Sequence, residues 1–351
     1  MSIFGTTTGT GDPRTRRRFL SLLATAAAGS ATAACGGAAG DTGPEGAATL
    51  RYQGWAGQVT LPELAQDLGY LGKVKLRWVG DTISGPQDIQ SAATGQVDFG
   101  GAFNGAVVKL QAAGAPITSV IGYYGTDRLY HEGFYVREDS PIRTARDLIG
   151  RKVGMNTLGG HAEAVLDIYL RRSGLSAEEA GKVEPVALPP VNTEQTLRQG
   201  RLDVAVLAGI FEEKALAGGG LRRLFADHEL LGSFTAGTYV FRDEFIRRDP
   251  ESVRAFTSGI ARAIEWTRTT PRAQVVARLE KIMKNRGRNE SPDALRYWKS
   301  TGVAGRGGVI SDREFATWIR WLEEKGRIPK GRIRPRDLYT NEFNPYAGGG
   351  S

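Results

Sequence analysis

Hydrophobic residues follow two different periods along the chain, that of a strand and that of a helix, and segments of the two kinds alternate. Residues 49–53 have the composition of a strand, and residues 73–79 alternate apolar and charged side chains, as a half-buried strand does. Between them, leucines recur at helical spacing over residues 64–71. Thr60 and Glu63, which precede these leucines, have the spacing of a capping box and predict where the helix begins. The alternation of strand and helix predicts an α/β fold with a mostly parallel sheet.

The same order of elements occurs twice. Expected strands and helices over residues 49–123 are followed by a second series over residues 151–207. Residues 91–100 align with residues 196–205, since each segment is a helix end, a glycine, and an aspartate between apolar residues. We interpret Asp98 and Asp203 as structural residues that bind free amide groups where a buried strand begins.

Two short apolar segments connect the repeated halves and predict a chain that crosses between two lobes. These segments cover residues 133–141 and 238–243. We expect the first lobe to contain residues 49–132 and 238–340, the second lobe to contain residues 133–237, and a tail to follow at 341–351. Further helices are expected at 251–267, 272–284, 292–299 and 311–326.

The first 34 residues have the organisation of an export signal. Arg16 and Arg17 are followed by an apolar stretch that ends in small residues and is too short to span a membrane. The arginine pair predicts the twin-arginine export route. Cys35, the only cysteine, follows in a context similar to a bacterial lipobox and is the predicted site of a lipid anchor. Ordinary cleavage near Ala34 is the alternative. Residues 35–48 are then a flexible linker.

Composition and charge exclude several classes of protein. The chain has 351 residues, 40% of them hydrophobic and 24% charged, which is ordinary for a soluble globular protein. Part of the net charge of +8 lies in the first 34 residues, and the rest is spread along the chain, so no nucleic-acid partner is predicted. A single cysteine allows no internal disulfide and no cysteine-based metal site. No metal or cofactor is therefore predicted.

Several segments, taken in order, resemble one family of binding proteins. They are residues 93–100, 112–117, 139–142, 147–153, 188–190 and 199–203. The chain resembles type II periplasmic solute-binding proteins of ABC importers, in the branch that binds nitrate, taurine and aliphatic sulfonates. This resemblance implies two α/β lobes joined by two hinge strands, with a small ligand, here an anion, in the cleft. It also implies a membrane permease as partner and an extracytoplasmic location.

The candidate ligand-binding residues lie in loops that follow predicted strands. In the first lobe they are Gln53 and Trp55, then Asn104, which is also predicted to cap a helix, and Tyr124. In the second lobe, Thr157, Gly159, Gly160 and His161 lead into a helix whose N-terminal amides favour an anion. The resemblance implies that this second loop holds the anionic group.

One departure from the family pattern concerns the ligand. Where many relatives have an acidic residue after the last buried strand of the second lobe, this chain has residues 208–211, Ala-Gly-Ile-Phe. The missing acid disfavours a ligand amine. Alkanesulfonates, aromatic acids, nitrate and vitamin precursors stay open as ligands.

No catalytic motif of a known enzyme class is present in the sequence, so a non-enzymatic function is predicted. Two alternatives remain. One is a ligand-sensing lipoprotein that docks on a receptor. The other is an enzyme of pyrimidine or thiamine-precursor synthesis on the same fold.

Overall fold

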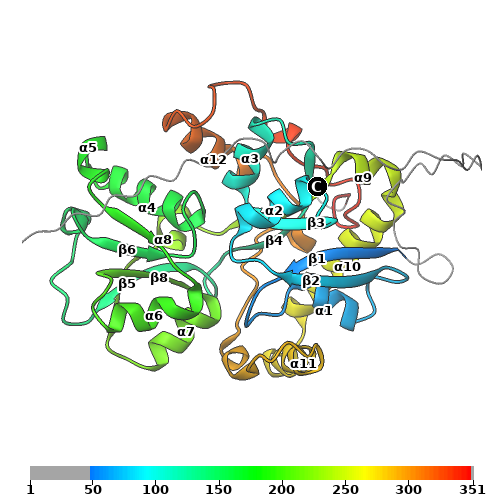
Figure 1. Ribbon diagram of the computed structural model, residues 1–351, viewed down its shortest axis with the longest axis horizontal. Helices are drawn as coiled ribbons and strands as arrows, with labels where there is room; N and C mark the ends of the chain where they lie inside the picture. Colours follow the sequence, from blue (N-terminus) through cyan, green and yellow to red (C-terminus); the bar gives the residue numbers. More distant parts are fainter. Residues whose placement is uncertain (1–47, 349–351) are drawn as a thin grey trace, which may run out of the picture. The chain divides into compact units, whose positions relative to one another are not determined.

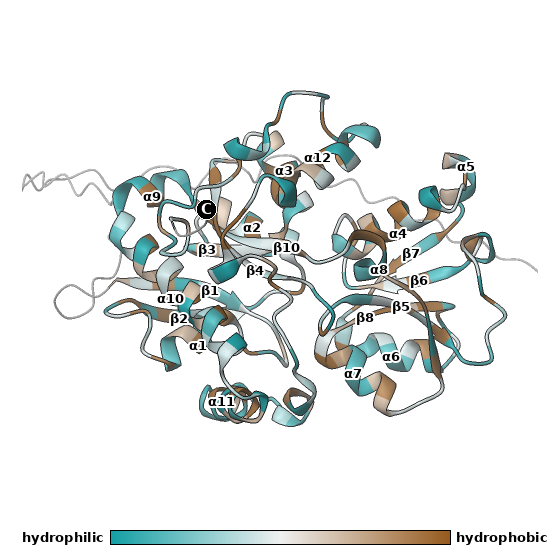
Figure 2. Ribbon diagram, turned by 180° about the vertical axis from the view of Figure 1, so that it is seen from behind, coloured by the Kyte–Doolittle hydropathy of each residue, from teal (hydrophilic) through white to brown (hydrophobic). Residues whose placement is uncertain are grey.

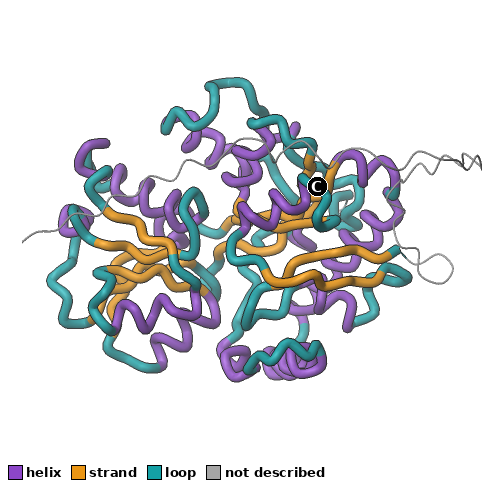
Figure 3. The backbone as a smooth tube through the Cα atoms, viewed as in Figure 1, coloured by secondary structure: helices purple, strands orange, loops and turns teal. Residues whose placement is uncertain are grey.

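The computed structural model describes residues 48–348, and the predicted export signal, including Arg16, Arg17 and Cys35, lies outside this range. Within it, strands gather in two groups, each flanked by helices (Figure 3). We call the first group with its helices lobe I and the second lobe II. The two-lobed α/β fold predicted from the sequence is confirmed.

Lobe I contains a parallel pair of strands and a three-stranded sheet of order β3-β10-β4. In Figure 1, its blue and cyan segments lie beside yellow and orange segments from late in the chain, because α10 packs on α1 and β4. The elements of lobe I are β1 (Thr49–Gly54), α1 (Leu61–Asp67), β2 (Lys75–Asp81), α2 (Gly85–Ala93), β3 (Phe99–Phe103), α3 (Asn104–Ala112), β4 (Ile117–Thr126), β10 (Phe234–Arg242), α9 (Asp243–Arg248), α10 (Pro250–Thr269), α11 (Arg272–Asn285) and α12 (Arg313–Glu324). The predicted helix at 292–299 is a 3-10 helix, Pro292–Tyr297.

Lobe II is built on a five-stranded sheet of order β7-β6-β8-β5-β9, coloured green in Figure 1. Its elements are β5 (Glu132–Arg137), β6 (Lys152–Met155), α4 (His161–Arg172), α5 (Ala177–Ala180), β7 (Glu184–Ala187), α6 (Pro190–Arg198), β8 (Val204–Ala208), α7 (Gly209–Ala217), β9 (Leu221–Ala226) and α8 (Asp227–Leu231). In Figure 2, α6 carries hydrophobic residues on one part of its surface and hydrophilic residues on the rest, as expected for a helix that covers a sheet.

The sheets are mixed rather than mostly parallel. Strand β5 runs antiparallel to β8 and β9, and β10 runs antiparallel to β3 and β4. The chain passes from one lobe to the other at each of these two strands. Each of them therefore runs opposite to the strands beside it in its sheet. The remaining pairs, β1-β2, β6-β7 and β6-β8, are parallel.

The internal repeat is confirmed at the level of single hydrogen bonds. The backbone N–H of Arg51 donates to the Asp98 carboxylate at 2.7 Å, and the N–H of Asp98 donates back to the Arg51 carbonyl. Lys152 and Asp203 make the same pair of bonds in lobe II, with the carboxylate bond at 2.9 Å. Both aspartates therefore connect strands in the way the sequence predicts.

Hydrophobic cores hold each lobe, and one of them includes residues of both. One buried cluster centres on Phe256 and Ile260 of α10, and another centres on Val165 of α4 and Val204 of β8. A third surrounds Trp318 of α12 and also contains Ala164 and Ile168, on the neighbouring turns of α4. Helices α4 and α12 are thus packed together across the two lobes.

Candidate functional site: a cavity lined by both lobes

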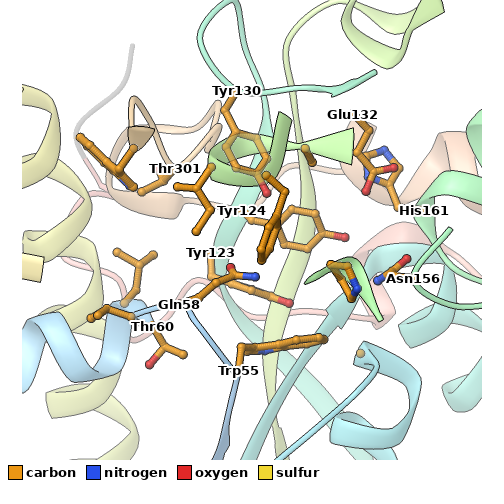
Figure 4. A pocket seen from close by; sticks show the side chains of 18 of the residues that line it. Trp55, Gln58, Thr60, Tyr123, Tyr124, Tyr130, Glu132, Asn156, His161 and Thr301 are labelled. Carbon is orange, nitrogen blue, oxygen red and sulfur yellow. The ribbon is translucent and has the colours of Figure 1, made fainter. Parts of the chain in front are cut away.

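A cavity of about 270 Å³ is lined by residues of lobe I and lobe II. Figure 4 shows side chains from both lobes around it, with Trp55, Gln58 and Thr60 of lobe I facing Asn156 and His161 of lobe II. The cavity is lined by loops at strand ends and by the first turns of helices, where α/β folds place their ligands. The lining includes Trp55, Gln58, Thr60, Gly85, Phe103, Tyr123, Tyr124, Tyr130, Glu132, Asn156, Thr157, Gly160, His161, Pro190, Thr193, Ala208, Phe211, Tyr239, Trp298 and Thr301.

Four of the helices that begin at the cavity have no side chain capping their first turn. They are α3, α4, α6 and α7, each at least nine residues long. The first N–H groups of a helix lack partners inside it, and the helix dipole adds partial positive charge there. In the part of the cavity wall that the structure describes there is no lysine or arginine. An electronegative ligand group would therefore meet backbone amides at these helix starts and neutral polar side chains, rather than a lysine or arginine.

Aromatic rings form much of the remaining wall. The ring of Tyr123 stacks on Tyr239 at 4.1 Å between centroids and meets the edge of Tyr124 at 4.9 Å. Burial raises the pKa of all three tyrosines well above its ordinary value, so their hydroxyl groups stay protonated. The wall thus offers flat apolar surface together with neutral hydroxyl groups.

His161, the first residue of α4, is buried between two carboxylates and an aromatic cluster. Its Nδ1 lies 3.4 Å from Glu132 Oε1, and its Nε2 lies 3.4 Å from Asp227 Oδ2. Its ring stacks on Phe103 at a centroid distance of 5.3 Å. Burial lowers the pKa of His161, but the charges of Glu132 and Asp227 outweigh it and raise this pKa above the ordinary value. Burial in turn raises the pKa of Asp227 to about 6.

The loop that carries Trp55 is fixed by residues from far along the chain. Arg286 donates to the Gln58 carbonyl at 2.8 Å, and Glu290 accepts the N–H of Gly57 at 2.6 Å. Arg286 also pairs at 3.0 Å with Glu63, the acid of the predicted capping box, whose two bonds with Thr60 are both present. The start of α1 and the Trp55 loop are therefore held as one unit.

Comparison with known proteins places the chain in a family. Residues 64–274 match the family model described as NMT1/THI5 like. The chain belongs to the NMT1/THI5-like family. Among curated relatives, a protein of Escherichia coli (strain K12) named as an aliphatic sulfonates-binding protein is 28% identical over 211 residues, which cover 60% of this chain and 62% of that protein. The match therefore spans less than two thirds of that relative's length.

This NMT1/THI5-like chain also has enzymatic relatives and solved structural neighbours. The 4-amino-5-hydroxymethyl-2-methylpyrimidine phosphate synthase THI12 of Saccharomyces cerevisiae is 25% identical over 226 residues, 59% of this chain and 63% of that enzyme. The crystal structure of the periplasmic aliphatic sulphonate binding protein SsuA from Escherichia coli superposes with a TM-score of 0.63 at 23% identity, and covers 84% of this chain and 92% of that one. The sulphonate-binding protein and the present chain therefore share a fold.

Five of the eight predicted ligand-binding residues line the cavity. They are Trp55, Tyr124, Thr157, Gly160 and His161. Tyr123, next to Tyr124 in β4, lines it as well.

Gln53, Asn104 and Gly159 lie outside the lining. The prediction that Asn104 caps α3 was wrong: it is the first helical residue, fully buried, and its amide donates to the carbonyls of Thr235 and Glu314. The N–H of Gly159 donates to Glu163 at 2.6 Å, so it already has an acceptor within the chain. Gln53, in β1, keeps its side-chain oxygen buried away from the cavity lining.

Sequence reasoning missed part of the lining of this NMT1/THI5-like cavity. Tyr130 and Glu132 lie within three residues of the predicted crossing at 133, and a residue next to a crossing is expected to lie between the lobes. The position of the crossing is therefore the sequence signal for these two residues. Trp298 and Thr301 come from the C-terminal segment and reach the cavity only through long-range packing, so no local pattern indicates them.

Within residues 48–348, no helix is both long and apolar enough to cross a membrane. The same residues place no group of three or more His, Cys, Asp or Glu side chains where they could hold a metal ion.

Proposed function

We propose that this protein is the extracytoplasmic solute-binding component of an ABC importer and that it captures a small organic anion in the cavity between its lobes. The observation that carries the proposal is the cavity itself, which combines uncapped helix starts from both lobes with an aromatic wall. Family membership and the names of the Escherichia coli relatives support it.

The size of the cavity favours an organic ligand over nitrate. A volume of about 270 Å³ is close to that of pockets for small organic ligands, whereas nitrate has only four heavy atoms. Nitrate would leave most of the aromatic wall without contact. A sulfonate or carboxylate on a flat apolar body would place its charge at the helix starts and its body against Trp55, Tyr123 and Tyr124.

In this proposal the chain is exported by its paired arginines, Arg16 and Arg17, and held at the membrane by a lipid on Cys35. The lobes close around the ligand by small changes at the two crossings, 133–137 and 237–241. Delivery of the ligand to a membrane permease then requires only that the two lobes open.

The test is binding followed by recovery of the probe. Benzenesulfonate, ethanesulfonate and nitrate are added separately to the purified protein in a thermal-shift assay, and the bound probe is identified by native mass spectrometry. We expect benzenesulfonate to raise the melting temperature most, nitrate least, and every probe to be recovered unchanged. Chemical conversion of a bound probe would instead favour an enzymatic function.

Cellular uptake separates an importer from a sensor. Deleting the gene should abolish uptake of labelled benzenesulfonate by the cells if the protein serves a permease. Unchanged uptake after the deletion would favour a receptor-coupled lipoprotein.

A further inference from the structure

Residues 208–211, at the end of β8, carry no acid, but a carboxylate reaches this place from the neighbouring strand. Glu132 begins β5, and in the register of the sheet it lies directly opposite Ala208, the last residue of β8. Both residues line the cavity. Figure 4 shows the Glu132 side chain next to His161 at the lobe II side of the cavity.

The charges around Glu132 do not balance within the described residues. Glu132 is the one carboxylate among the lining residues that the structure describes, and His161 is the one basic side chain there. Behind them, Asp227 is fully buried and outside the lining. Glu132 and Asp227 therefore both face the single imidazole of His161.

Asp227 has partners on both of its oxygens. Its Oδ1 accepts the backbone N–H of Glu132 at 3.1 Å, and its Oδ2 accepts the hydroxyl of Thr126 and pairs with His161. Glu132 Oε1 lies at ion-pair distance from His161, while Oε2 is buried without any hydrogen-bond partner. Buried polar atoms are rarely left without a partner, because each costs free energy.

We propose that Glu132 sets the specificity of the cavity by accepting a hydrogen bond from a cationic or N–H group of the ligand, so that the ligand is amphoteric, with an acidic group at one end and a nitrogen donor at the other. This inference rests on the proposed function and deepens it. The acidic group lies at the uncapped helix starts, the flat body lies against the tyrosines, and the nitrogen meets Oε2 of Glu132. The amine disfavoured by the sequence at residues 208–211 is thus favoured by the structure through Glu132.

Three probes of closely related size test this directly. They are benzenesulfonate, 4-(aminomethyl)benzenesulfonate and benzylamine, measured by isothermal titration at pH 7 against the full-length wild type, Glu132→Gln and Glu184→Gln. Glu184, an exposed residue of β7, is the matched control because it loses the same charge outside the cavity. Thermal unfolding of each variant checks that it is folded. If Glu132→Gln does not fold, Glu132→Asp, which retains the charge, is measured as the second variant.

We expect the wild type and Glu184→Gln to bind 4-(aminomethyl)benzenesulfonate roughly ten- to a hundredfold more tightly than benzenesulfonate, the range for a hydrogen bond to a charged group. Glu132→Gln should lose most of this preference, and Glu132→Asp should keep part of it. Benzylamine binding that depends on Glu132, without benzenesulfonate binding, would show that Glu132 accepts from a nitrogen donor, but it would overturn the amphoteric ligand and the anion of the proposed function.

Equal affinity for the two sulfonates, unchanged in Glu132→Gln, would overturn the inference and leave the importer function in place. Tighter binding of benzenesulfonate by Glu132→Gln than by the wild type would also overturn it, since Glu132 would then only repel anions. Binding of none of the three probes by the wild type would overturn both this ligand class and the proposed organic anion.

Discussion

Trp321 donates its indole N–H to Asp167 at 2.9 Å, and this bond joins α12 of lobe I to α4 of lobe II. Lys325 and Arg171 also pair with the same carboxylate, and Arg327 reaches Glu163 one turn earlier on α4 at 3.0 Å. Asp167 is almost completely buried. The helix that begins at His161 is therefore attached along its side to the opposite lobe.

Removing this acceptor should destabilise the protein. In Asp167→Ala, the buried indole N–H of Trp321 loses its acceptor and Lys325 loses its partner. We expect the free energy of unfolding to fall by about 1–3 kcal/mol, measured by urea denaturation. Glu178→Ala, which removes an exposed i,i+4 pair with Lys182, is the control and should cost less than about 0.5 kcal/mol. Equal effects of the two substitutions would mean that the contact between α4 and α12 carries no special stability.

Replacing Trp55 should weaken ligand binding without unfolding the protein. Trp55 is only half-buried and lies in a loop that Arg286 and Glu290 hold in place by backbone contacts. Loss of aromatic contact area in Trp55→Ala should weaken benzenesulfonate binding about tenfold in an isothermal titration, since aromatic contacts contribute about 1 kcal/mol or more. Trp78→Ala, an exposed tryptophan outside the cavity, should bind as the wild type does. Wild-type affinity in Trp55→Ala would place the ligand elsewhere in the cavity.

A side chain at Gly160 should interfere with the approach of an anion to α4. Gly160 precedes the helix with a φ of −96°, which any residue can adopt, and a Cβ there would meet the Thr157 side chain at 2.8 Å. The fold of Gly160→Val should therefore survive with a small shift of Thr157. We expect binding of benzenesulfonate to weaken roughly tenfold or more, as for loss of a charge-assisted hydrogen bond. A folded variant with undiminished affinity would show that the start of α4 does not hold the anion.

Asp88 should make stability depend on pH. Burial raises the pKa of this carboxyl to about 7, although it accepts the N–H of Gly101 at 2.7 Å. In the unfolded chain the pKa is about 3.9, so the folded state binds the proton more tightly, and this group lowers stability as the pH rises from about 4 to about 7. Asp88→Asn keeps an acceptor for Gly101 and removes the charge.

We therefore expect Asp88→Asn to gain stability relative to the wild type between pH 5 and pH 8, by about 3 kcal/mol at most. Urea denaturation at the two pH values measures the difference. Asp139→Asn, at a highly exposed carboxylate, should show no such gain. A constant difference between Asp88→Asn and the wild type at both pH values would contradict the raised pKa.

Export and anchoring can be tested by cell fractionation. Replacing Arg16 and Arg17 with lysine should leave precursor in the cytoplasm, because the twin-arginine route requires the arginine pair. Cys35→Ala should release the protein from the membrane fraction. Normal export of the lysine variant would exclude the twin-arginine route, and membrane retention of Cys35→Ala would exclude the lipid anchor.

The repeated elements could be predicted from the sequence because their signals are local. Residues 91–100 and 196–205 each contain the glycine and the aspartate that close a helix and begin a strand, and the structure places both aspartates in the same reciprocal hydrogen bonds. The capping box of Thr60 and Glu63 was readable for the same reason. Periodicity and short motifs report on a few neighbouring residues. The repeated elements and the capping box depend only on such neighbours.

The direction of the crossing strands and the role of Asn104 could not be predicted in this way. In the sequence, strand β5 looks like any other apolar segment. Its antiparallel pairing with β8 depends on how the chain after β5 folds back to form β8. Asn104 has the composition of a cap, but its amide bonds to Thr235 and Glu314, more than a hundred residues away. The position of Glu132 next to the predicted crossing indicates that it lies between the lobes, but its place opposite Ala208 depends on the register between distant strands.

Part of the cavity wall is separate from the hydrophobic interior of the lobes. Trp55, Gln58, Asn156, Thr157 and Phe211 line the cavity and belong to none of the buried hydrophobic clusters. The backbone of the surrounding strands and helices sets their positions, while their side chains contribute little to either core. Substitutions at these five positions can therefore retarget the protein to a different solute while the scaffold still folds, which makes it a suitable starting point for evolving new binding specificities.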